Sequence, residues 1–382
     1  MSNVFVIETV RSHRMDRALL LMTLLLGGIG LTMLFSVSYS RADALFQNPF
    51  YFVQRQGILM LIGVAGALLL SCIDLEFIEK SIPLVVIVNI ILLLLTFIPQ
   101  LGATYLGARR WIVLLGFSFQ PSELLKLTLV LYLGFLLGRK QDRFDDPVNT
   151  LLPPVMITAV LAAIVYFQND FSTAVFVLVI ASLMFFVAGI KLRYFISLFI
   201  MVVPLLTILV LSREHRVNRI LTFLEPALDP RGSGYQVMMS QTALRTGGLW
   251  GQGIGMGRYK FGLLPEAHSD FLFAIVGEEL GYIGVLAVLG MFLYLGYRGF
   301  LIATHAKTGF IRLSAFGLSA AIVYQAMLNM AVVSGVVPAT GITLPFFSSG
   351  GTSAMVTLWM CGILLNLSRF TACEPENRRA HG

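Results

Sequence analysis

Apolar runs of about 20 residues recur along the chain and constrain its fold more than any other feature. A helix of that length crosses the hydrocarbon core of a bilayer, because each residue advances it by about 1.5 Å. Of the 382 residues, 57% are hydrophobic and 12% are charged, which is more apolar surface than a soluble core of this length needs. The pattern predicts an all-α integral membrane protein with ten transmembrane helices. The predicted spans are residues 18–40, 56–73, 82–99, 121–138, 150–167, 171–189, 194–212, 271–297, 311–333 and 350–369.

The distribution of Lys and Arg predicts the orientation of the chain. An even number of spans places both termini on one side, and fifteen Lys and Arg residues fall in the segments on that side, against four in the short loops opposite. Cytoplasmic loops carry the excess of positive charge, so both termini are expected in the cytoplasm. No cleavable signal peptide is expected, because the first apolar run is full length. The predicted organisation is a single polytopic membrane domain, with a tail (1–17), seven spans (18–212), a long extracytoplasmic loop (213–270), three spans (271–369) and a second tail (370–382).

Three outer segments are not predicted to cross the membrane. The longest, Ser212 to Asp270, carries seven Lys and Arg residues and a series of glycines. Loops of that length escape the positive-inside rule, and long loops are usually functional or disordered. This loop keeps aromatic and aliphatic side chains, so we expect it to pack against the membrane face. The segments 101–120 and 334–351 are apolar but interrupted, which indicates interfacial or re-entrant pieces enclosed by protein.

The densest group of titratable side chains lies where the eighth predicted span begins. Glu266, His268 and Asp270 fall within five residues there. An Asp at a helix start commonly caps the free N–H groups, and the residues alone favour that interpretation. The functional alternative is a general base at the membrane surface. The two are compatible, because a helix N-terminus also attracts phosphate.

Two further carboxylates, Glu278 and Glu279, follow in the same predicted span. At about 1.5 Å per residue, Glu278 lies about 12 Å along the helix from Asp270. A charge at such depth costs about 2.5–3.5 kcal/mol unless it is paired or hydrated. Either one of them pairs with a cation on a neighbouring span, or they line a polar cavity.

Other polar residues near predicted span ends also have two interpretations. Glu123 and Lys126 share a helix face and can form an ion pair. The pair either has a purely structural role or places a cation beside an outer cavity. Arg109 and Arg110, next to Trp111, are typical interfacial anchors but could also bind a lipid phosphate. Asp170 is expected to cap the sixth predicted span.

The sequence lacks the motifs of several classes of enzyme, transporter and metal site. The chain has no Walker A loop, HExxH or Gly-x-Ser-x-Gly elbow, so neither ATP-driven transport nor hydrolase chemistry of those types is indicated. With five His residues, a histidine-based metal centre is not expected. Cys72, Cys361 and Cys373 show no metal-ligand spacing and imply no disulfide framework. No nucleic-acid partner is expected.

Three stretches of the sequence resemble signatures of the SEDS family (FtsW, RodA and SpoVE), in the family's order and somewhat closer to FtsW than to RodA. The first comprises 107–112 with 120–126, the second 234–236 with the glycine series, 264–271 and 277–281, and the third 340–351. Two positions depart from the family's usual pattern. Asn169 stands where Pro is usual, and Ser349 stands where Tyr is usual.

The resemblance implies a peptidoglycan glycosyltransferase of the bacterial plasma membrane. Such enzymes polymerise lipid II, the undecaprenyl-diphosphate-linked disaccharide pentapeptide, on the outer face of the membrane, alongside a class B penicillin-binding protein. The family's essential Asp matches Asp270. The candidate substrate-binding or phosphate-binding residues are Arg109, Arg110, Trp111, Glu123, Lys126, Glu266, His268, Ser348 and Ser349.

The implied chemistry is consistent with these residues. A diphosphate leaves readily, so one base suffices where glycoside hydrolysis needs two carboxylates, provided that cations stabilise the departing charge. One direct displacement would invert the anomeric centre. A divalent cation (Mg²⁺ or Mn²⁺) is left open as a cofactor, although the sequence offers no dedicated ligand set. A lipid II flippase and a non-catalytic scaffold that recruits a transpeptidase remain the alternatives; the outer position of the titratable group favours the enzyme.

Overall fold

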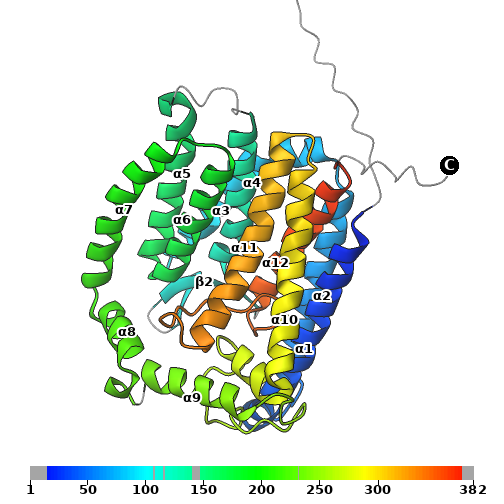
Figure 1. Ribbon diagram of the computed structural model, residues 1–382, viewed down its shortest axis with the longest axis vertical. Coiled ribbons are helices and arrows are strands. Elements are labelled where there is room, and N and C mark those ends of the chain that lie inside the picture. Colours follow the sequence, from blue (N-terminus) through cyan, green and yellow to red (C-terminus); the bar gives the residue numbers. More distant parts are fainter. Residues whose placement is uncertain (1–14, 106–107, 115–116, 140–146, 231, 372–382) are drawn as a thin grey trace, which may run out of the picture.

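The computed structural model describes residues 15–105, 108–114, 117–139, 147–230 and 232–371. Its elements in chain order are α1 (Arg17–Phe46), α2 (Tyr51–Cys72), α3 (Leu75–Leu95), β1 (Gly102–Tyr105), β2 (Ala108–Leu114), β3 (Phe117–Phe119), α4 (Pro121–Arg139), α5 (Pro147–Phe167), α6 (Phe171–Val187), α7 (Leu192–Leu211), α8 (Glu214–Leu224), the short 3-10 helix η2 (Pro226–Leu228), α9 (Ser233–Thr246), α10 (Leu272–Thr304), α11 (Gly309–Val333) and α12 (Gly351–Ser368). Figure 1 shows the long helices running side by side, with α8 and α9 across one end of the bundle.

The long helices overlap the predicted apolar spans, with ends that differ by up to seven residues. Among the described residues, eight helices are long and apolar enough to cross a membrane. The apolar parts of α5 and α6, Leu151–Phe167 and Phe171–Val187, are shorter. The architecture is that of a multi-pass helical membrane protein, as the apolar runs predicted.

The helices differ in how deeply they are enclosed. α12 is buried on nearly all sides and packs against α2, while α11 packs between α10 and α4. At the other extreme, the described side chains of α7 are not buried at all, and α7 forms one edge of the molecule (Figure 1). A long apolar helix whose surface is mostly exposed requires a hydrocarbon environment.

Two parts of the outer region contain regular structure, and the first of them differs from the prediction. The segment 101–120 contains a three-stranded antiparallel sheet in the order β1-β2-β3, so the all-α fold class is wrong at this point. Its alternation of apolar and polar residues is too short and too interrupted by glycine to predict strands. The long loop is also not irregular throughout, because it contains α8, η2 and α9.

The eighth predicted span, α10, is interrupted at Gly281. This residue has φ of 67°, a left-handed conformation that glycine adopts at no steric cost, and it divides α10 into two helical segments. The glycine-rich part of the loop packs into the break. The backbone N–H of Tyr282 donates to the carbonyl of Gly248 (2.9 Å), and the N–H of Gln252 donates to the carbonyl of Glu278 (2.9 Å). The loop thereby satisfies backbone groups that the broken helix leaves open.

Candidate functional site

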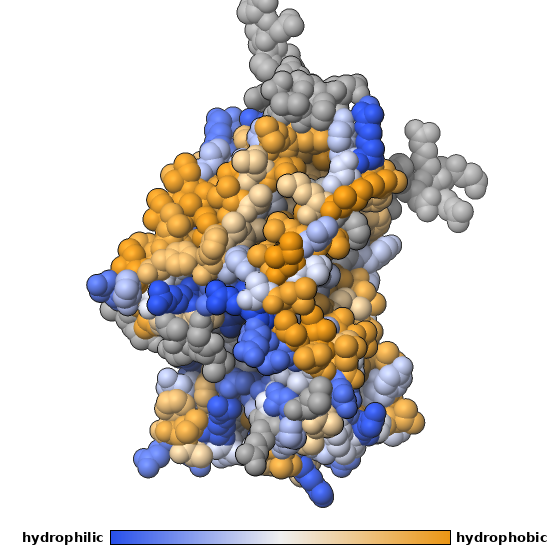
Figure 2. Space-filling model, turned by 90° about the vertical axis from the view of Figure 1, so that its left-hand side faces the viewer, coloured by the Kyte–Doolittle hydropathy of each residue, from blue (hydrophilic) through white to orange (hydrophobic). Residues whose placement is uncertain are grey.

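A cavity of about 580 Å³ lies where the sheet, α6, α8 and the start of α10 meet. Its polar lining includes Asp270, Asp170, Arg110 of β2 and cations in and next to α8, and residues 337–341 also contribute to the wall. Seen from the side of α7 and α8, hydrophilic side chains gather across the middle of the molecule, below a hydrophobic belt (Figure 2). A volume of this size is within the range of pockets that bind small ligands.

Asp270 lies in the irregular turn before α10, and it is not a helix cap. The capping position belongs to Phe271, and no side-chain hydrogen bond caps the helix. The cap interpretation, which the residues alone favoured, is therefore wrong. The carboxylate instead lines the cavity beside Gly341, where an added Cβ atom would lie 3.6 Å from Oδ2 of Asp270.

The surroundings of Asp270 suit a group that exchanges a proton near neutral pH. Burial raises the pKa of Asp270 to about 6, and the carboxylates of Glu266 and Asp170 act in the same direction. The guanidinium groups of Arg110 and Arg219 oppose this rise in pKa. A base is most effective when its pKa lies near the working pH.

Arg110 reaches the cavity because of an irregularity in the sheet. In the pairing of β1 with β2, Ala103 lies opposite Trp111 and Thr104 opposite Arg109, so Arg110 is the extra residue of a β-bulge. Bulges redirect side chains next to functional sites. Arg109, by contrast, is exposed, and neither Arg109 nor Trp111 lines the cavity.

Asp170 orients Arg110. Its Oδ2 lies 3.3 Å from Nη1 of Arg110, and its Oδ1 accepts a hydrogen bond from the backbone N–H of Thr173 (3.2 Å), which confirms the predicted cap of α6. The Nε of Arg110 is buried without a hydrogen-bond partner among the described residues. The guanidinium group is thus held in place with one donor unused. Asn169, which also lines the cavity, has φ of 63°, which the Pro usual at this position cannot adopt.

The sequence offered the arginines of the long loop as possible phosphate partners only as a group, without distinguishing those at α8. Arg213, which directly precedes α8, and His215, Arg216 and Arg219 of α8 line the cavity, and Arg219 donates to the carbonyl of Ala339 (3.2 Å). The signal that could have found them was the excess of positive charge in a loop that the positive-inside rule does not govern.

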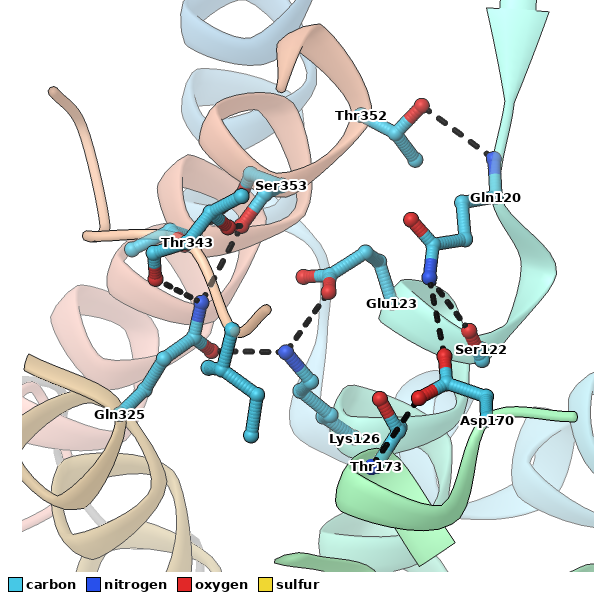
Figure 3. Close-up of polar contacts among 12 residues, drawn as sticks. Gln120, Ser122, Glu123, Lys126, Asp170, Thr173, Gln325, Thr343, Thr352 and Ser353 are labelled. Carbon is cyan, nitrogen blue, oxygen red and sulfur yellow. Dashed lines mark hydrogen bonds and ion pairs between the residues drawn. The ribbon is translucent and has the colours of Figure 1, made fainter. Parts of the chain in front are cut away.

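Glu123 and Lys126 form the predicted ion pair, but away from this cavity. Their side chains are 10% and 2% exposed, and Lys126 Nζ lies 2.8 Å from both Glu123 Oε1 and Gln325 Oε1. Gln325 donates in turn to the carbonyl of Thr343 and to Ser353 (Figure 3). The geometry favours the structural role, because this hydrogen-bond network connects α4, α11 and α12.

Glu266 and His268 turn away from Asp270. Glu266 has φ of 54°, and this turn directs its carboxylate and the His268 ring toward Arg41 of α1, at 3.9 Å and 3.3 Å. Burial lowers the pKa of His268, while Glu266 raises it and Arg41 lowers it. Neither side chain lines the cavity.

Ser348 and Ser349, in the segment before α12, form hydrogen bonds with backbone groups. The Ser348 hydroxyl accepts a hydrogen bond from the N–H of Leu344 (2.9 Å), and the N–H of Ser349 donates to the carbonyl of His268 (3.0 Å). Neither lines the cavity, so the structure does not bring them together with Asp270.

Glu278 and Glu279 bind groups of the long loop, and Glu279 also contacts the neighbouring helix α1. Glu279 contacts Nζ of Lys260 (2.7 Å) and the hydroxyl of Ser36 in α1. Glu278 accepts hydrogen bonds from the backbone N–H groups of Arg258 and Tyr259. The predicted pairing with a cation is correct for Glu279, but the cation comes from the loop. Within the described part of the chain, no three His, Cys, Asp or Glu residues cluster as metal ligands would.

Comparison with known proteins identifies the family. The cell cycle protein family FtsW/RodA/SpoVE matches residues 16–373. A protein of Geobacter metallireducens named probable peptidoglycan glycosyltransferase FtsW is 41% identical over 357 residues, covering 93% of this chain and 95% of that protein. Stage V sporulation protein E of Bacillus subtilis is 38% identical over 363 residues, covering 95% of this chain and 99% of that protein.

A solved structure agrees with these relatives. It is described as "Structural coordination of polymerization and crosslinking by a peptidoglycan synthase complex", and it superimposes with a TM-score of 0.77 and 27% identity, covering 93% of this chain and 98% of that chain. The family that the three motifs resembled is confirmed by sequence and by fold. The chain therefore belongs to the FtsW/RodA/SpoVE family of cell cycle proteins.

Proposed function

We propose that this protein is a peptidoglycan glycosyltransferase that polymerises lipid II at the outer face of the bacterial plasma membrane, with Asp270 as its general base. The observation that carries the proposal is a half-buried carboxylate of raised pKa in a cavity that also holds Arg110 and Arg219. The relatives named peptidoglycan glycosyltransferase support the reaction class.

The proposed reaction needs a base and cations from the protein. Asp270 accepts the proton of the attacking sugar hydroxyl while the anomeric carbon loses its lipid diphosphate, which inverts that centre. Arg110 and Arg219 stabilise the charge of the departing diphosphate, a role that suits guanidinium forks held in a partly dehydrated cavity.

The proposal includes the arrangement in the membrane. Ten spans form a single membrane domain with both termini in the cytoplasm, and the cavity opens on the extracytoplasmic side, where lipid II would be presented. A class B penicillin-binding protein is the proposed partner, and the similarity to a chain of a peptidoglycan synthase complex supports it.

The test is polymerisation of lipid II by purified protein, with and without the cognate transpeptidase. Asp270→Asn keeps the shape of the side chain but removes the base, and we expect it to abolish polymer formation. Asp74→Asn is the matched control, because Asp74 also precedes a helix, forms no side-chain cap and is exposed. Undiminished polymer from Asp270→Asn would refute the base assignment. Lipid II flipping without polymerisation would favour a transporter.

A further inference from the structure

Residues 337–341 line the cavity beside Asp270, and side chains from other elements bind the carbonyl groups of Ala339 and of two residues that directly follow this segment, Ile342 and Thr343. Arg219 binds the carbonyl of Ala339. From α11, Asn329 binds the carbonyl of Ile342 and Gln325 binds that of Thr343. Asn329 and Gln325 are four residues apart and lie on one face of α11.

Asn329 does more than hold this wall, because the same side-chain amide also binds the backbone of Asp270. Its Nδ2 lies 2.9 Å from the carbonyl oxygen of Asp270 and 2.8 Å from that of Ile342. Both neighbours are acceptors, so the amide nitrogen, with its two hydrogens, must be the atom that faces them. The residue is 1% exposed, so water does not compete for these hydrogen bonds.

The position of Asp270 depends on such a contact for a local reason. The residue lies in an irregular turn, and the helix that follows it begins without a side-chain cap. The Asn329 amide ties the carbonyl of Asp270 to the chain that lies against the Asp270 carboxylate. One side chain therefore fixes the base relative to one wall of its cavity.

We propose that Asn329 is a positioning residue that sets the place of the Asp270 carboxylate during the reaction. The inference rests on the proposed function, because it assumes that Asp270 is the base. A misplacement of about 1 Å can cost about a hundredfold in rate. Loss of the amide is therefore expected to lower turnover and leave lipid II binding largely intact.

The chain contains a matched control for a purely structural role. Asn366 of α12 is 0% exposed and also donates from Nδ2 to two carbonyl oxygens, those of Leu70 (2.6 Å) and Ile73 (2.7 Å). In both residues, Oδ1 is buried without a partner among the described residues. The two asparagines make the same bonds, but only Asn329 contacts Asp270.

The experiment compares Asn329→Asp and Asn329→Leu with Asn366→Asp and Asn366→Leu in the full-length protein. Melting temperature, kcat and KM for lipid II are measured for each. We expect both pairs to lower the melting temperature. We expect the Asn329 variants to lose about tenfold or more in kcat beyond their Asn366 counterparts, with KM within about twofold of the wild type.

Three results would overturn the proposal: equal losses of kcat in the two pairs, a change confined to KM, or failure of both Asn329 variants to fold while the Asn366 variants fold. Asp270→Asn is measured alongside, to distinguish failure of the proposed base from failure of the proposed positioning role. If Asp270→Asn retains polymerisation, the proposed base itself fails. If Asp270→Asn is inactive and the Asn329 variants match their controls, only the positioning role fails.

Discussion

At the scale of single residues, opposing charges set the protonation of Asp270. Burial raises its pKa to about 6, and Arg110 lowers it. A base must be deprotonated to accept a proton, so kcat/KM should fall as the pH drops through about 6. Replacing Arg110 with Gln removes a group that lowers the pKa, so the midpoint of this acid limb should move to higher pH. The measurement is the pH profile of lipid II polymerisation.

The control for this shift lies next to Arg110 in the same strand. Arg109 is exposed and does not line the cavity, so Arg109→Gln should leave the midpoint in place. An unchanged midpoint in Arg110→Gln, or an equal shift in both variants, would contradict the assignment of this limb to Asp270.

The site residues show which parts of the chemistry the sequence can predict. Asp270 and Arg110 were predicted by motif and charge, and both line the cavity. Glu266 and His268 are only four and two residues from Asp270, yet they face α1, because the left-handed turn at Glu266 redirects the chain. Arg219 and Asn329 come from α8 and α11, and no pattern in the sequence indicates that folding brings them to Asp270.

At the scale of elements, the break in α10 explains the glycine series of the long loop. A Cβ atom on Gly281 would collide with the backbone of Gly251 and Leu249, and its backbone conformation (φ 67°, ψ -170°) adds a penalty of about 1–3 kcal/mol for any other residue. Gly281→Ala should therefore displace the loop and lower the melting temperature. Limited trypsin digestion should then cut after Lys260, which is buried in the wild type.

Gly290→Ala is the matched control in the same helix. A Cβ atom there meets nothing within 4 Å, and Ala is favoured over Gly in a helix by about 0.8–1.0 kcal/mol. This variant should keep the wild-type digestion pattern and melt no lower. If Gly281→Ala and Gly290→Ala give the same digestion pattern and melting temperature, the position of the loop does not depend on the break in α10.

The elements that the sequence predicted are those with long apolar runs. Runs of about 20 residues identify the long helices because few other structures accommodate them. The strands between Gly102 and Phe119 are three to seven residues long, and the amphipathic α8 has 11, so neither produces a run of that kind. These short elements carry Arg110 and Arg219, which is why the cavity could not be assembled from the sequence.

At the scale of the whole molecule, contacts between distant segments support the proposed topology. The backbone N–H of Asp16 donates to the hydroxyl of Ser368 (3.1 Å), so the start of α1 lies beside the end of α12. The Asp16 carboxylate also lies 2.6 Å from the guanidinium group of Arg298. Arg298 is near the C-terminal end of α10, whereas Asp270 precedes its N-terminal end. Two helix ends that share hydrogen bonds lie on one side of a bilayer, which agrees with an even number of spans.

This arrangement predicts which positions a membrane-impermeant thiol reagent reaches in intact cells. In a background whose native cysteines are replaced, Ile254→Cys in the exposed part of the long loop should be labelled directly. Lys307→Cys, exposed between α10 and α11, should be labelled only after the membrane is permeabilised. Labelling of Lys307→Cys in intact cells, with Ile254→Cys protected, would invert the topology and place Asp270 in the cytoplasm. Lipid II presented on the outer face could then not reach the cavity, so this labelling also tests whether the proposed reaction is on the correct side of the membrane.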